Sequence, residues 1–392
     1  MAPAVEAAQT KALTGEALKY NRPVRVAIDI RKLHDYGIGT YVSNLVRGLA
    51  RLDHDHEYTL ICHPNDVDFV RALGGNFRAW PDRAGNYSLR EQLSIPIDVW
   101  RVRPDLFHAP HYVLPPLTPG KTVVTIHDCI HLRFPQYLPN RAAHLYARVF
   151  LSSAAKKASR VITVSEASKR DIIELLHTPP GKVEVVYNGF DERLTSPSAE
   201  DKVRVRDRFQ LDAPFVLYAG NIKPHKNVDR LIEAFALLRQ RGMGNVTLLI
   251  IGDDISKYSN LRRLVHRHQL HQQVRFLGFV STDTLAALYQ LAQVFVFPSL
   301  YEGFGLPPLE AMANGTPVIT SNVSSLPEVV DDAAVLIDPL DADGIANAMY
   351  RVLNEPELRA ELVRRGHDRV KAFSWTKSVA RTHEIYMDVL RG

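Results

Sequence analysis

Two glutamates and two glycines follow a short apolar run three quarters of the way along the chain. The run Val294–Phe297 is typical of a buried strand, and the Tyr-Glu-Gly-Phe-Gly sequence after it is typical of a loop. Pro307 and the alanines beyond it indicate a helix that begins directly after this loop. Glu302 is therefore expected on the loop, and Glu310, eight residues later, about one turn into the helix.

Such a junction presents free backbone N–H groups and the positive end of a helix dipole, which together favour an anion. Glycines at 303 and 305 allow a ligand to approach the backbone closely. Two carboxylates could accept hydrogen bonds from hydroxyl groups on either side of a bound phosphate, an arrangement that suits a nucleotide sugar better than a lone phosphate. The alternative is an ordinary strand-to-helix turn, in which Glu302 is a solvated acid and Glu310 a favourable first-turn charge.

The sequence E-G-F-G-L-P-P-L-E-A-M-A-N-G-T-P-V-I, which begins at Glu302, resembles the E-x7-E signature of retaining glycosyltransferases of family 4. Members of that family have the two-domain GT-B fold. The resemblance implies that Glu310 binds the ribose diol of a nucleotide-sugar donor and that the loop holds the donor sugar and phosphate. The residues implied on this loop are Glu302, Gly303, Phe304, Gly305 and Leu306.

The sequence Ala-Gly-Asn-Ile-Lys-Pro-His-Lys-Asn around Lys226 is the second match to the family. Gly220 directly after a strand allows close approach, and a fixed ammonium at Lys226 can stabilise charge that grows on a departing diphosphate. The family has an arginine at the position of Asn221 or beside the lysine, where this chain has His225. This departure leaves open whether Lys223 or His225 supplies a second cation. The alternative for Lys226 is a solvated lysine at a helix start.

The loop Gly278-Phe279-Val280 resembles the loop whose backbone contacts the nucleotide base in this family, so Phe279 and Val280 are implied in donor binding. Gly252-Asp253-Asp254 lacks the D-x-D pattern of a metal site in the right place. Enzymes with the GT-B fold hold the diphosphate with a helix dipole and basic residues. We therefore expect no metal ion and no cofactor.

Two groups of residues in the first half are candidates for the opposite wall of a cleft. Thr-Ile-His-Asp, with His127 and Asp128, follows a predicted strand and resembles the family's H-D pattern, which implies that His127 contacts the donor sugar. Asp128 could orient His127 or fix the turn, and His111 is a second candidate for a sugar or acceptor contact. A single histidine at such a position is often structural.

Gly37 and Gly39 open a predicted helix, and the family has a similar glycine loop there, which implies contact with the donor or acceptor. A nicotinamide-binding fingerprint is disfavoured because its third glycine position is Val42. Ser165 and Ser168 resemble a family segment, but a serine N-cap before a helix explains them without any substrate.

Short β-rich runs alternate with amphipathic segments along the whole chain of 392 residues. The twelve predicted strands are 24–30, 58–61, 106–108, 122–126, 161–164, 184–187, 216–219, 247–251, 274–277, 294–297, 318–320 and 334–337. This alternation predicts an α/β protein with parallel sheets covered on both faces. The chain is too long for one ordinary core, so we expect two Rossmann-like domains that face an interdomain cleft, and the resemblance to family 4 implies that these have the GT-B architecture. The expected divisions are a flexible leader at 1–20, a first domain at 21–195, a second domain at 212–370 and a C-terminal helix at 371–392. The resemblance implies that the first domain is on the acceptor side, that the second binds the nucleotide sugar, and that the last helix crosses back to the first domain.

The formal net charge is +5, from 48 basic and 43 acidic residues that are interspersed, and no nucleic-acid-binding motif accompanies it. Two cysteines without metal-type spacing fit a reduced, cytoplasmic compartment. The apolar runs are too short to cross a bilayer, so any membrane contact would be peripheral, at the inner face of the cytoplasmic membrane. Basic residues between 134 and 157 are candidates for meeting a lipid-linked or anionic acceptor, although an ordinary exposed helix explains them equally.

The resemblance to family 4 implies a retaining hexosyltransferase, with mannose from GDP-mannose as the expected donor and a glycan or lipid-linked hydroxyl as the acceptor. The chemistry expected is a metal-independent front-face substitution, with Lys226, Glu302 and His127 at the reacting centre. The alternatives are a UDP-sugar glycosyltransferase, an epimerase, a phosphorylase or a non-catalytic nucleotide-sugar-binding subunit. Phosphorylases have much longer chains and a pyridoxal lysine that this sequence lacks.

Overall fold

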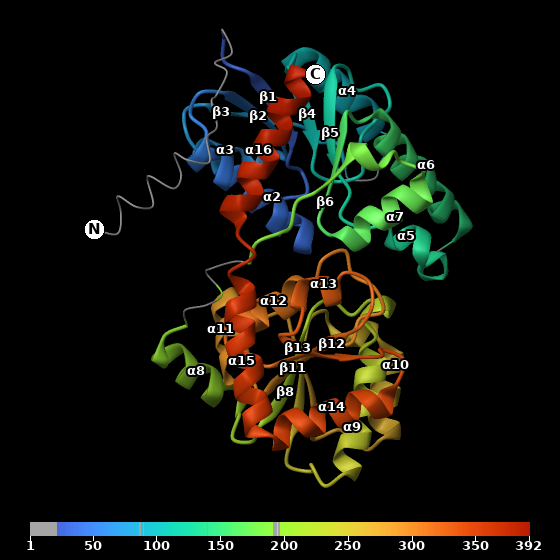
Figure 1. Cartoon of the computed structure of the whole chain (residues 1–392), viewed down its shortest axis with the longest axis vertical. Helices are drawn as coiled ribbons and strands as arrows, with labels where there is room; N and C mark the ends of the chain where they lie inside the picture. The colour runs from blue at the N-terminus through green and yellow to red at the C-terminus, as the bar shows by residue number, and fades with distance from the viewer. Residues whose placement is uncertain (1–21, 86–87, 89, 139, 191–193, 195–196) are drawn as a thin grey trace.

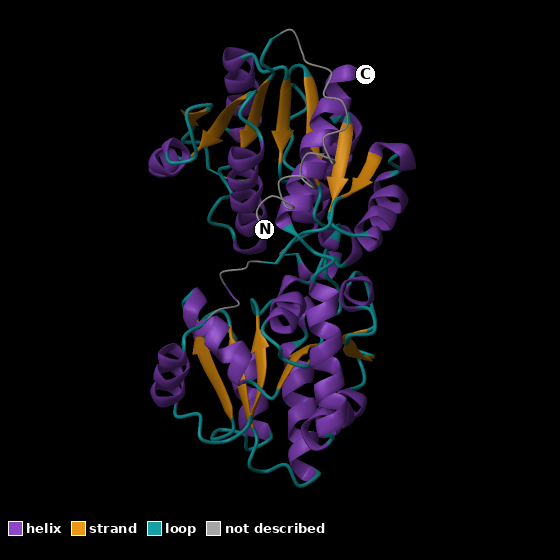
Figure 2. Cartoon of the chain, turned by 60° about the vertical axis from the view of Figure 1, so that its left-hand side comes forward, coloured by secondary structure: helices purple, strands orange, loops and turns teal. Residues whose placement is uncertain are grey.

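The computed structural model describes residues 22–85, 88, 90–138, 140–190, 194 and 197–392. The predicted leader at 1–20 lies outside the described residues. The described chain forms two α/β halves, one above the other in Figure 1, and each half is built around its own parallel sheet. Figure 2 shows the strands of each sheet enclosed between helices.

The first sheet has seven strands in the order β3-β2-β1-β4-β5-β6-β7. Its strands are β1 (Arg25–Asp29), β2 (Glu57–Cys62), β3 (Phe77–Pro81), β4 (Leu106–Ala109), β5 (Lys121–Thr125), β6 (Arg160–Thr163) and β7 (Val183–Val185). Its helices are α2 (Tyr36–Leu52), α3 (Val67–Arg71), α4 (Glu91–Val102), α5 (Ile130–Arg133), α6 (Arg141–Lys157) and α7 (Glu166–Leu176), with short 3-10 turns η1 (Pro64–Asp66), η2 (Pro135–Tyr137) and η3 (Pro180–Lys182).

The second sheet has six strands in the order β10-β9-β8-β11-β12-β13. Its strands are β8 (Phe215–Ala219), β9 (Thr247–Ile251), β10 (Val274–Gly278), β11 (Val294–Phe297), β12 (Val318–Ser321) and β13 (Ala334–Ile337). Its helices are α8 (Ala199–Phe209), α9 (Val228–Gln240), α10 (Ser259–Arg267), α11 (Thr282–Leu291), α12 (Leu306–Ala313), α13 (Leu326–Val330), α14 (Ala342–Asn354) and α15 (Pro356–Val370), with turns η5 (Pro224–Lys226) and η6 (Ile255–Lys257).

Both sheets follow from the sequence pattern. Central strands such as β8 (Phe-Val-Leu-Tyr-Ala) and β11 (Val-Phe-Val-Phe) are apolar throughout and buried at every position, as expected where helices cover both faces of a parallel sheet. In each sheet the strand order reverses once, between β1 and β4 and between β8 and β11. Loops diverge at such a point and leave a crevice beyond the carboxyl ends of the strands, which is where open α/β sheets bind ligands.

The last helix, α16 (Trp375–Arg391), packs on the first half although α15 before it packs on the second. Trp375, Val379 and Tyr386 join the same core as α2. His108 at the end of β4 hydrogen-bonds the Tyr386 hydroxyl through Nδ1 at 2.6 Å. The two ends of the described chain therefore belong to one half.

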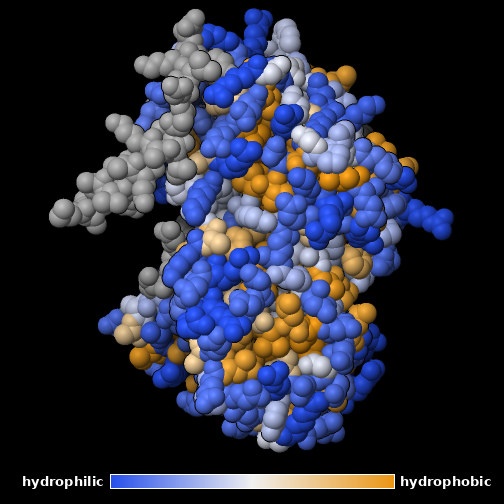
Figure 3. Space-filling view, viewed as in Figure 1, coloured by the Kyte–Doolittle hydropathy of each residue, from blue (hydrophilic) through white to orange (hydrophobic). Residues whose placement is uncertain are grey.

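The polar surface seen in Figure 3 is interrupted by apolar residues on both halves. None of the helices within the described ranges is long and apolar enough to cross a bilayer.

Candidate functional site

The glycine loop and its helix form as expected from the sequence. Gly305 is the N-cap of α12 with φ of 113°, a left-handed conformation that favours glycine. A Cβ atom on Gly303 would lie 2.5 Å from the carbonyl oxygen of His127, so only glycine fits where this loop meets the first half. The loop thus lies between the two sheets, directly beyond β11.

Lys226 and Glu302 lie on the loops that follow the neighbouring strands β8 and β11. These loops meet beyond the point where the strand order reverses. The Lys226 ammonium lies 2.7 and 2.8 Å from the two carboxylate oxygens of Glu302. It also lies 5.3 Å from the centre of the Phe297 ring. Both charged side chains are only 13% and 11% exposed. Partial burial strengthens this ion pair and fixes its position at the mouth of the glycine loop.

Several hydrogen bonds hold the two loops in this arrangement. The amide of Asn227, which has φ of 60°, donates to the carbonyls of Pro298 and Pro339 at 3.0 and 2.7 Å. The backbone N–H of Leu300 donates to the carbonyl of His225 at 2.8 Å. The loop that carries Lys226 is therefore tied directly to the loop that carries Glu302.

Two serines after β12 support Glu302 from behind. The Glu302 N–H donates to the Ser324 hydroxyl at 2.9 Å, and the Ser325 hydroxyl contacts the carbonyls of Glu302 and Phe304 at 3.0 and 2.7 Å. Because these bonds use the backbone, the Glu302 carboxylate stays directed at Lys226. The sequence analysis did not single out Ser324 or Ser325, and no local pattern marks them.

His225 does not supply a second positive charge at this site when no anion is bound. Burial first, then the charges of Lys226 and Lys223, lower the pKa of His225 to about 3, so the imidazole is neutral at physiological pH. Lys223 is exposed on the same turn. Lys226 is therefore the cation at the glycine loop, with Lys223 at its solvent side.

The other predicted residues of the second half lie around this centre at different depths. Gly220 has φ of 154°, and the Tyr218 hydroxyl donates to the Asn221 carbonyl at 2.9 Å. Glu310 accepts a hydrogen bond from the buried Tyr289 hydroxyl at 3.1 Å, so α11 fixes its carboxylate. Phe304 is buried and packs on Phe373 with ring centres 5.6 Å apart.

Phe304 can therefore face a ligand only through its backbone. Leu306 likewise packs against the core of the second half.

His127 lies against the glycine loop from the first half. Its Nε2 hydrogen-bonds the Pro110 carbonyl at 3.0 Å, its ring packs edge-on against Tyr41 at 4.9 Å, and burial lowers its pKa. A neutral imidazole suits a hydrogen bond to a sugar hydroxyl. The Asp128 carboxylate accepts from the Ile130 N–H at 3.0 Å, so it fixes the turn.

A contact between the halves that the sequence did not predict surrounds the glycine loop. The hydroxyls of Ser165 and Ser168 donate to the Gly303 carbonyl at 2.7 and 3.1 Å, and Ser165 also caps α7. The capping role was predicted. The Tyr301 hydroxyl donates to Asp171 at 2.5 Å and accepts from the Cys129 N–H at 3.2 Å.

Glu328 of α13 extends this contact. Its carboxylate accepts from the N–H groups of Glu166 and Ala167 at 2.7 and 3.2 Å and from the Tyr187 hydroxyl at 2.8 Å. A carboxylate from one half therefore occupies the positive end of a helix in the other.

The remaining predicted residues lie at a separate hollow between the halves. Gly37 and Gly39 are in the first turn of α2, and the residue before them, Tyr36, donates its hydroxyl to Asp253 at 3.0 Å. Two cavities of about 450 and 520 Å³ adjoin here, and Tyr36 and Phe279 line both. Gly39 lines the second cavity, whereas Gly37 lines neither. Phe279 is 85% exposed, and Val280 packs beside the core of the second half.

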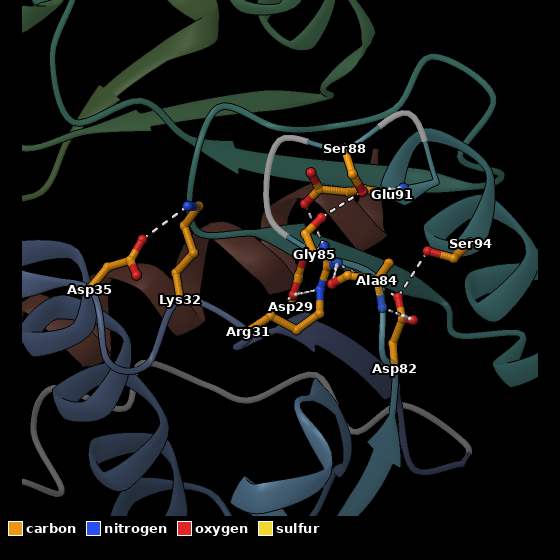
Figure 4. Close-up of polar contacts among 10 residues, drawn as sticks. All are labelled: Asp29, Arg31, Lys32, Asp35, Asp82, Ala84, Gly85, Ser88, Glu91 and Ser94. Atoms are coloured by element: carbon orange, nitrogen blue, oxygen red, sulfur yellow. Dashed lines mark hydrogen bonds and ion pairs between the residues drawn. The ribbon is translucent and has the colours of Figure 1, made fainter.

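A buried ionic cluster at the end of β1 was also missed, and Figure 4 shows it. The Arg31 guanidinium lies 2.7 Å from carboxylate oxygens of both Asp29 and Glu91, and 3.6 Å from Asp82, with Arg31 only 1% exposed. The neighbouring Lys32 pairs with Asp35 at 3.0 Å. Because Asp29, Asp82 and Glu91 are far apart in the sequence, only the fold brings them together. The cluster fixes the backbone that leads from β1 into α2.

In the part of the chain that the structure describes, the side chains at the glycine loop form no cluster of metal ligands. Among the residues that the structure describes, Asp53, His56 and His383 form a group of side chains close enough to share an ion, and this group lies at the opposite end of α2 from Gly37. Hydrogen bonds already join these three, with both imidazoles 3.0 to 3.1 Å from the carboxylate. The absence of a metal requirement stays a prediction.

Comparison with known families matches almost the whole described chain. The model "Glycosyltransferase Family 4" matches residues 36–194, and "Glycosyl transferases group 1" matches residues 199–369. The O-antigen chain mannosyltransferase B of Escherichia coli is 33% identical over 370 residues, which cover 89% of this chain and 95% of that protein. The serotype-specific mannosyltransferase WbdA of Escherichia coli is 31% identical over 272 residues, 66% of this chain and 32% of that protein.

Solved structures share the fold at lower identity. Sucrose-phosphate synthase from Thermosynechococcus elongatus superposes with a TM-score of 0.78 at 24% identity, covering 94% of this chain and 99% of that one. Anabaena Alr3699/HepE, solved in complex with UDP and glucose, gives a TM-score of 0.76 at 20% identity over 93% and 100% of the two chains. The family models and the relative that is 33% identical show that the chain belongs to glycosyltransferase family 4. The two parallel sheets and the solved structures show that it has the GT-B fold.

Proposed function

We propose that this glycosyltransferase moves a mannosyl unit from GDP-mannose to a hydroxyl of a glycan or lipid-linked acceptor, with retention of the anomeric configuration. The observation that carries the proposal is the Lys226–Glu302 pair at the mouth of the glycine loop. It combines a fixed cation for a diphosphate with a carboxylate for sugar hydroxyls. Two mannosyltransferases among the relatives support mannose as the sugar.

In this proposal the bound donor replaces the ion pair between Lys226 and Glu302 and contacts each of the two side chains itself. The diphosphate takes the Lys226 ammonium, together with the N–H groups at the start of α12. The Glu302 carboxylate is then available to accept hydrogen bonds from sugar hydroxyls, and His127 contacts the sugar from the first half. Glu310, held by Tyr289, accepts from the ribose diol.

The reaction follows from this placement. The bond between the anomeric carbon and the phosphate oxygen breaks, and its electron pair goes to the phosphate. The acceptor oxygen bonds to the same face of that carbon, and its proton passes to a phosphate oxygen. Charge grows on the leaving diphosphate, so Lys226 stabilises the transition state more than the ground state. Helix dipole and ammonium take the place that a divalent cation has in other transferases, and we propose that no metal or cofactor is needed.

The acceptor is proposed to enter from the side of the first half, beside His127 and the hollow at Gly39. A cytoplasmic location, with peripheral contact at the inner face of the membrane, would give access to a lipid-linked acceptor. No nucleic-acid partner is proposed.

A UDP-sugar is the second candidate donor. It is favoured by a structural neighbour solved in complex with UDP-glucose. That neighbour shares the fold, and its identity of 20% carries no donor preference by itself.

The test is thermal-shift and calorimetric binding of GDP, UDP, ADP and their sugars in the presence of EDTA. Tight binding and slow hydrolysis of GDP-mannose are expected. Preference for UDP-glucose would replace the donor and keep the transferase assignment. Donor use that requires added Mn²⁺ would contradict metal independence, and a failure of every nucleotide to bind would contradict the role given to the cleft.

A further inference from the structure

Two imidazoles converge on one buried carboxylate where the end of α2 meets α16. Asp53 is the C-cap of α2, His56 follows three residues later, and His383 belongs to α16. The His56 Nδ1 and His383 Nε2 atoms lie 3.0 and 3.1 Å from the same oxygen of Asp53, and one atom from each residue lies within 4.8 Å of the other two. The Asp53 side chain is 5% exposed, and the two imidazoles are 16% and 21% exposed. The group is therefore shielded on the carboxylate side and reached by water on the histidine side.

More donors meet the Asp53 carboxylate than its lone pairs accommodate. Its Oδ2 atom lies 3.0, 3.1 and 2.5 Å from His56, His383 and the Tyr58 hydroxyl. Its Oδ1 atom lies 3.0 Å from the Asp55 N–H and 3.0 Å from His56 again. A carboxylate offers about four lone-pair sites, and these contacts exceed that number. A cation in place of the two imidazole protons relieves the crowding, because one ion then shares a single lone pair with both nitrogens.

The surroundings hold these groups in place and favour a positive charge. The Asn76 side chain donates to the carbonyls of Asp53 and His56 at 3.0 and 2.9 Å, which fixes the turn between them. The Asp55 N–H and the Tyr58 hydroxyl orient the carboxylate. Outer partners of this kind orient the ligands of metal sites. The C-terminal end of a helix, here that of α2, adds partial negative charge.

We propose that Asp53, His56 and His383 bind one Zn²⁺ ion, which joins the end of α2 to α16. Two imidazoles and one carboxylate, with water in the fourth position, form a known zinc ligand set. Zinc bonds of about 2.0–2.1 Å place neighbouring ligand atoms about 3.3 Å apart in a tetrahedral site. Both distances from imidazole to carboxylate are already close to that value, and the partly exposed rings can rotate toward each other. Without the ion the same three groups hydrogen-bond one another, so the metal-free chain keeps its fold.

This inference goes beyond the proposed transfer reaction and does not depend on it. The site lies at the opposite end of α2 from Gly37, so the ion takes no part in the transfer. Zinc binding is measured without nucleotide, so its outcome and that of the nucleotide test are separate.

The experiment starts from the full chain, treated with EDTA and then freed of it. Titration with ZnCl₂ in a calorimeter should show one ion bound per chain. Thermal unfolding should shift to higher temperature as zinc is added, because an ion that binds the folded state stabilises it, and EDTA should reverse the shift. MgCl₂ should have neither effect, since Mg²⁺ prefers oxygen ligands in octahedral geometry.

His383→Gln separates a zinc site from a purely hydrogen-bonded group. Its amide keeps a donor for Asp53 but is a poor zinc ligand, so zinc affinity should fall by about 100-fold or more, beyond the roughly 10–100-fold that loss of an outer partner causes. His56→Gln should give the same loss through the other imidazole. His54→Gln is the matched control, since His54 is an exposed neighbour, and it should bind zinc like the wild type. Circular dichroism without zinc checks that each variant is folded.

The absence of a one-to-one zinc complex in the wild type would overturn the proposal, as would equal zinc affinities of His383→Gln and the wild type. His266 and His271 of the second half, with ring centres 5.3 Å apart, are a competing pair of imidazoles. Zinc binding that His266→Gln removes and His383→Gln keeps would assign the ion to that pair and also overturn the proposal.

Discussion

At the scale of single residues, Lys226 is the position where charge matters most. Lys226→Ala should lower kcat by about 100-fold or more, because one fixed donor to a developing anion contributes that much to many enzymes. Lys371→Ala is the control, since Lys371 is exposed at the end of α15 and pairs with Asp368. Steady-state kinetics with the best donor measures both, and turnover close to wild type in Lys226→Ala would remove Lys226 from its assigned role.

Gly37 and Gly39 provide a matched pair within one turn of α2. A Cβ atom on Gly39 would lie 2.3 Å from the Leu33 carbonyl oxygen, whereas one on Gly37 would have nothing within 4 Å. Gly39→Ala should therefore lower the free energy of unfolding, and Gly37→Ala should leave it equal or raise it by about 0.5–1 kcal/mol through helix propensity. Urea titration of both variants measures this. Equal effects would contradict the packing that requires glycine at 39 alone.

At the scale of elements, the sequence predicted twelve of the strands because each is a short apolar run. β3, the strand at the edge of the first sheet, was missed. Its Arg78 and Pro81 are exposed and interrupt the apolar residues, so no continuous apolar run marks it as a strand. The segment left between the two predicted domains, 196–211, contains α8, which packs on α11 and contributes the buried Val205 to the core of the second half. A charged helix with one buried residue resembles a linker in composition, and only tertiary packing distinguishes the two.

The attachment of α16 should depend on pH. Asp53 at the end of α2 accepts from His56, from the Tyr58 hydroxyl at 2.5 Å and from His383 of α16 at 3.1 Å. Although burial acts the other way, these bonds lower the pKa of Asp53; the hydrogen bond to Asp53 raises the pKa of His56. The contribution of His56 is full below its ordinary pKa of about 6.5 and is lost as pH rises through the raised value.

The urea concentration at the unfolding midpoint of the metal-free wild type should therefore decrease as the pH is raised from 6 to 8.5. His56→Gln should show a smaller decrease. The exposed neighbour His54 supplies the control His54→Gln, which should keep the wild-type pH dependence. At acid pH the dependence has the opposite sign: the contribution of Asp53 to stability is lost as the pH falls below the ordinary pKa of an aspartate. If the pH profile of His56→Gln were identical to that of the wild type, titration of His56 would not contribute to stability.

At the scale of the whole molecule, contacts around Gly303 and Glu328 hold the halves together. Glu328→Ala removes three hydrogen bonds to the first half, and charge-assisted bonds contribute about 1.5–3 kcal/mol each. We expect the population to shift toward a more open arrangement, seen as a larger radius of gyration in solution scattering. Glu361→Ala, which removes a carboxylate paired with Arg364 and Arg365 within α15, should leave the radius unchanged. Equal radii for both variants would contradict a role of Glu328 in closure.

Sequence motifs identified the loops of the cleft, because Lys226 and Glu302 belong to long, local patterns. They did not indicate that these two side chains contact each other, since β8 and β11 are far apart in the sequence. Tyr301, Glu328 and the Arg31 cluster were missed for the same reason. Tyr301 and Glu328 contact residues of the other half, and Arg31 pairs with Glu91, which is 60 residues away, so no local spacing records these contacts.

The return of α16 to the first half determines how the chain can be recombined with its relatives. A single crossover between the halves would leave Tyr386 from one parent facing His108 from the other, and His383 facing a foreign Asp53. Functional chimeras therefore need two junctions, one near Asn188 and one near Ser374, so that the last helix is inherited with the amino-terminal half. Exchange of the segment between them would transplant the second half with its glycine loop, while the first half keeps its own last helix.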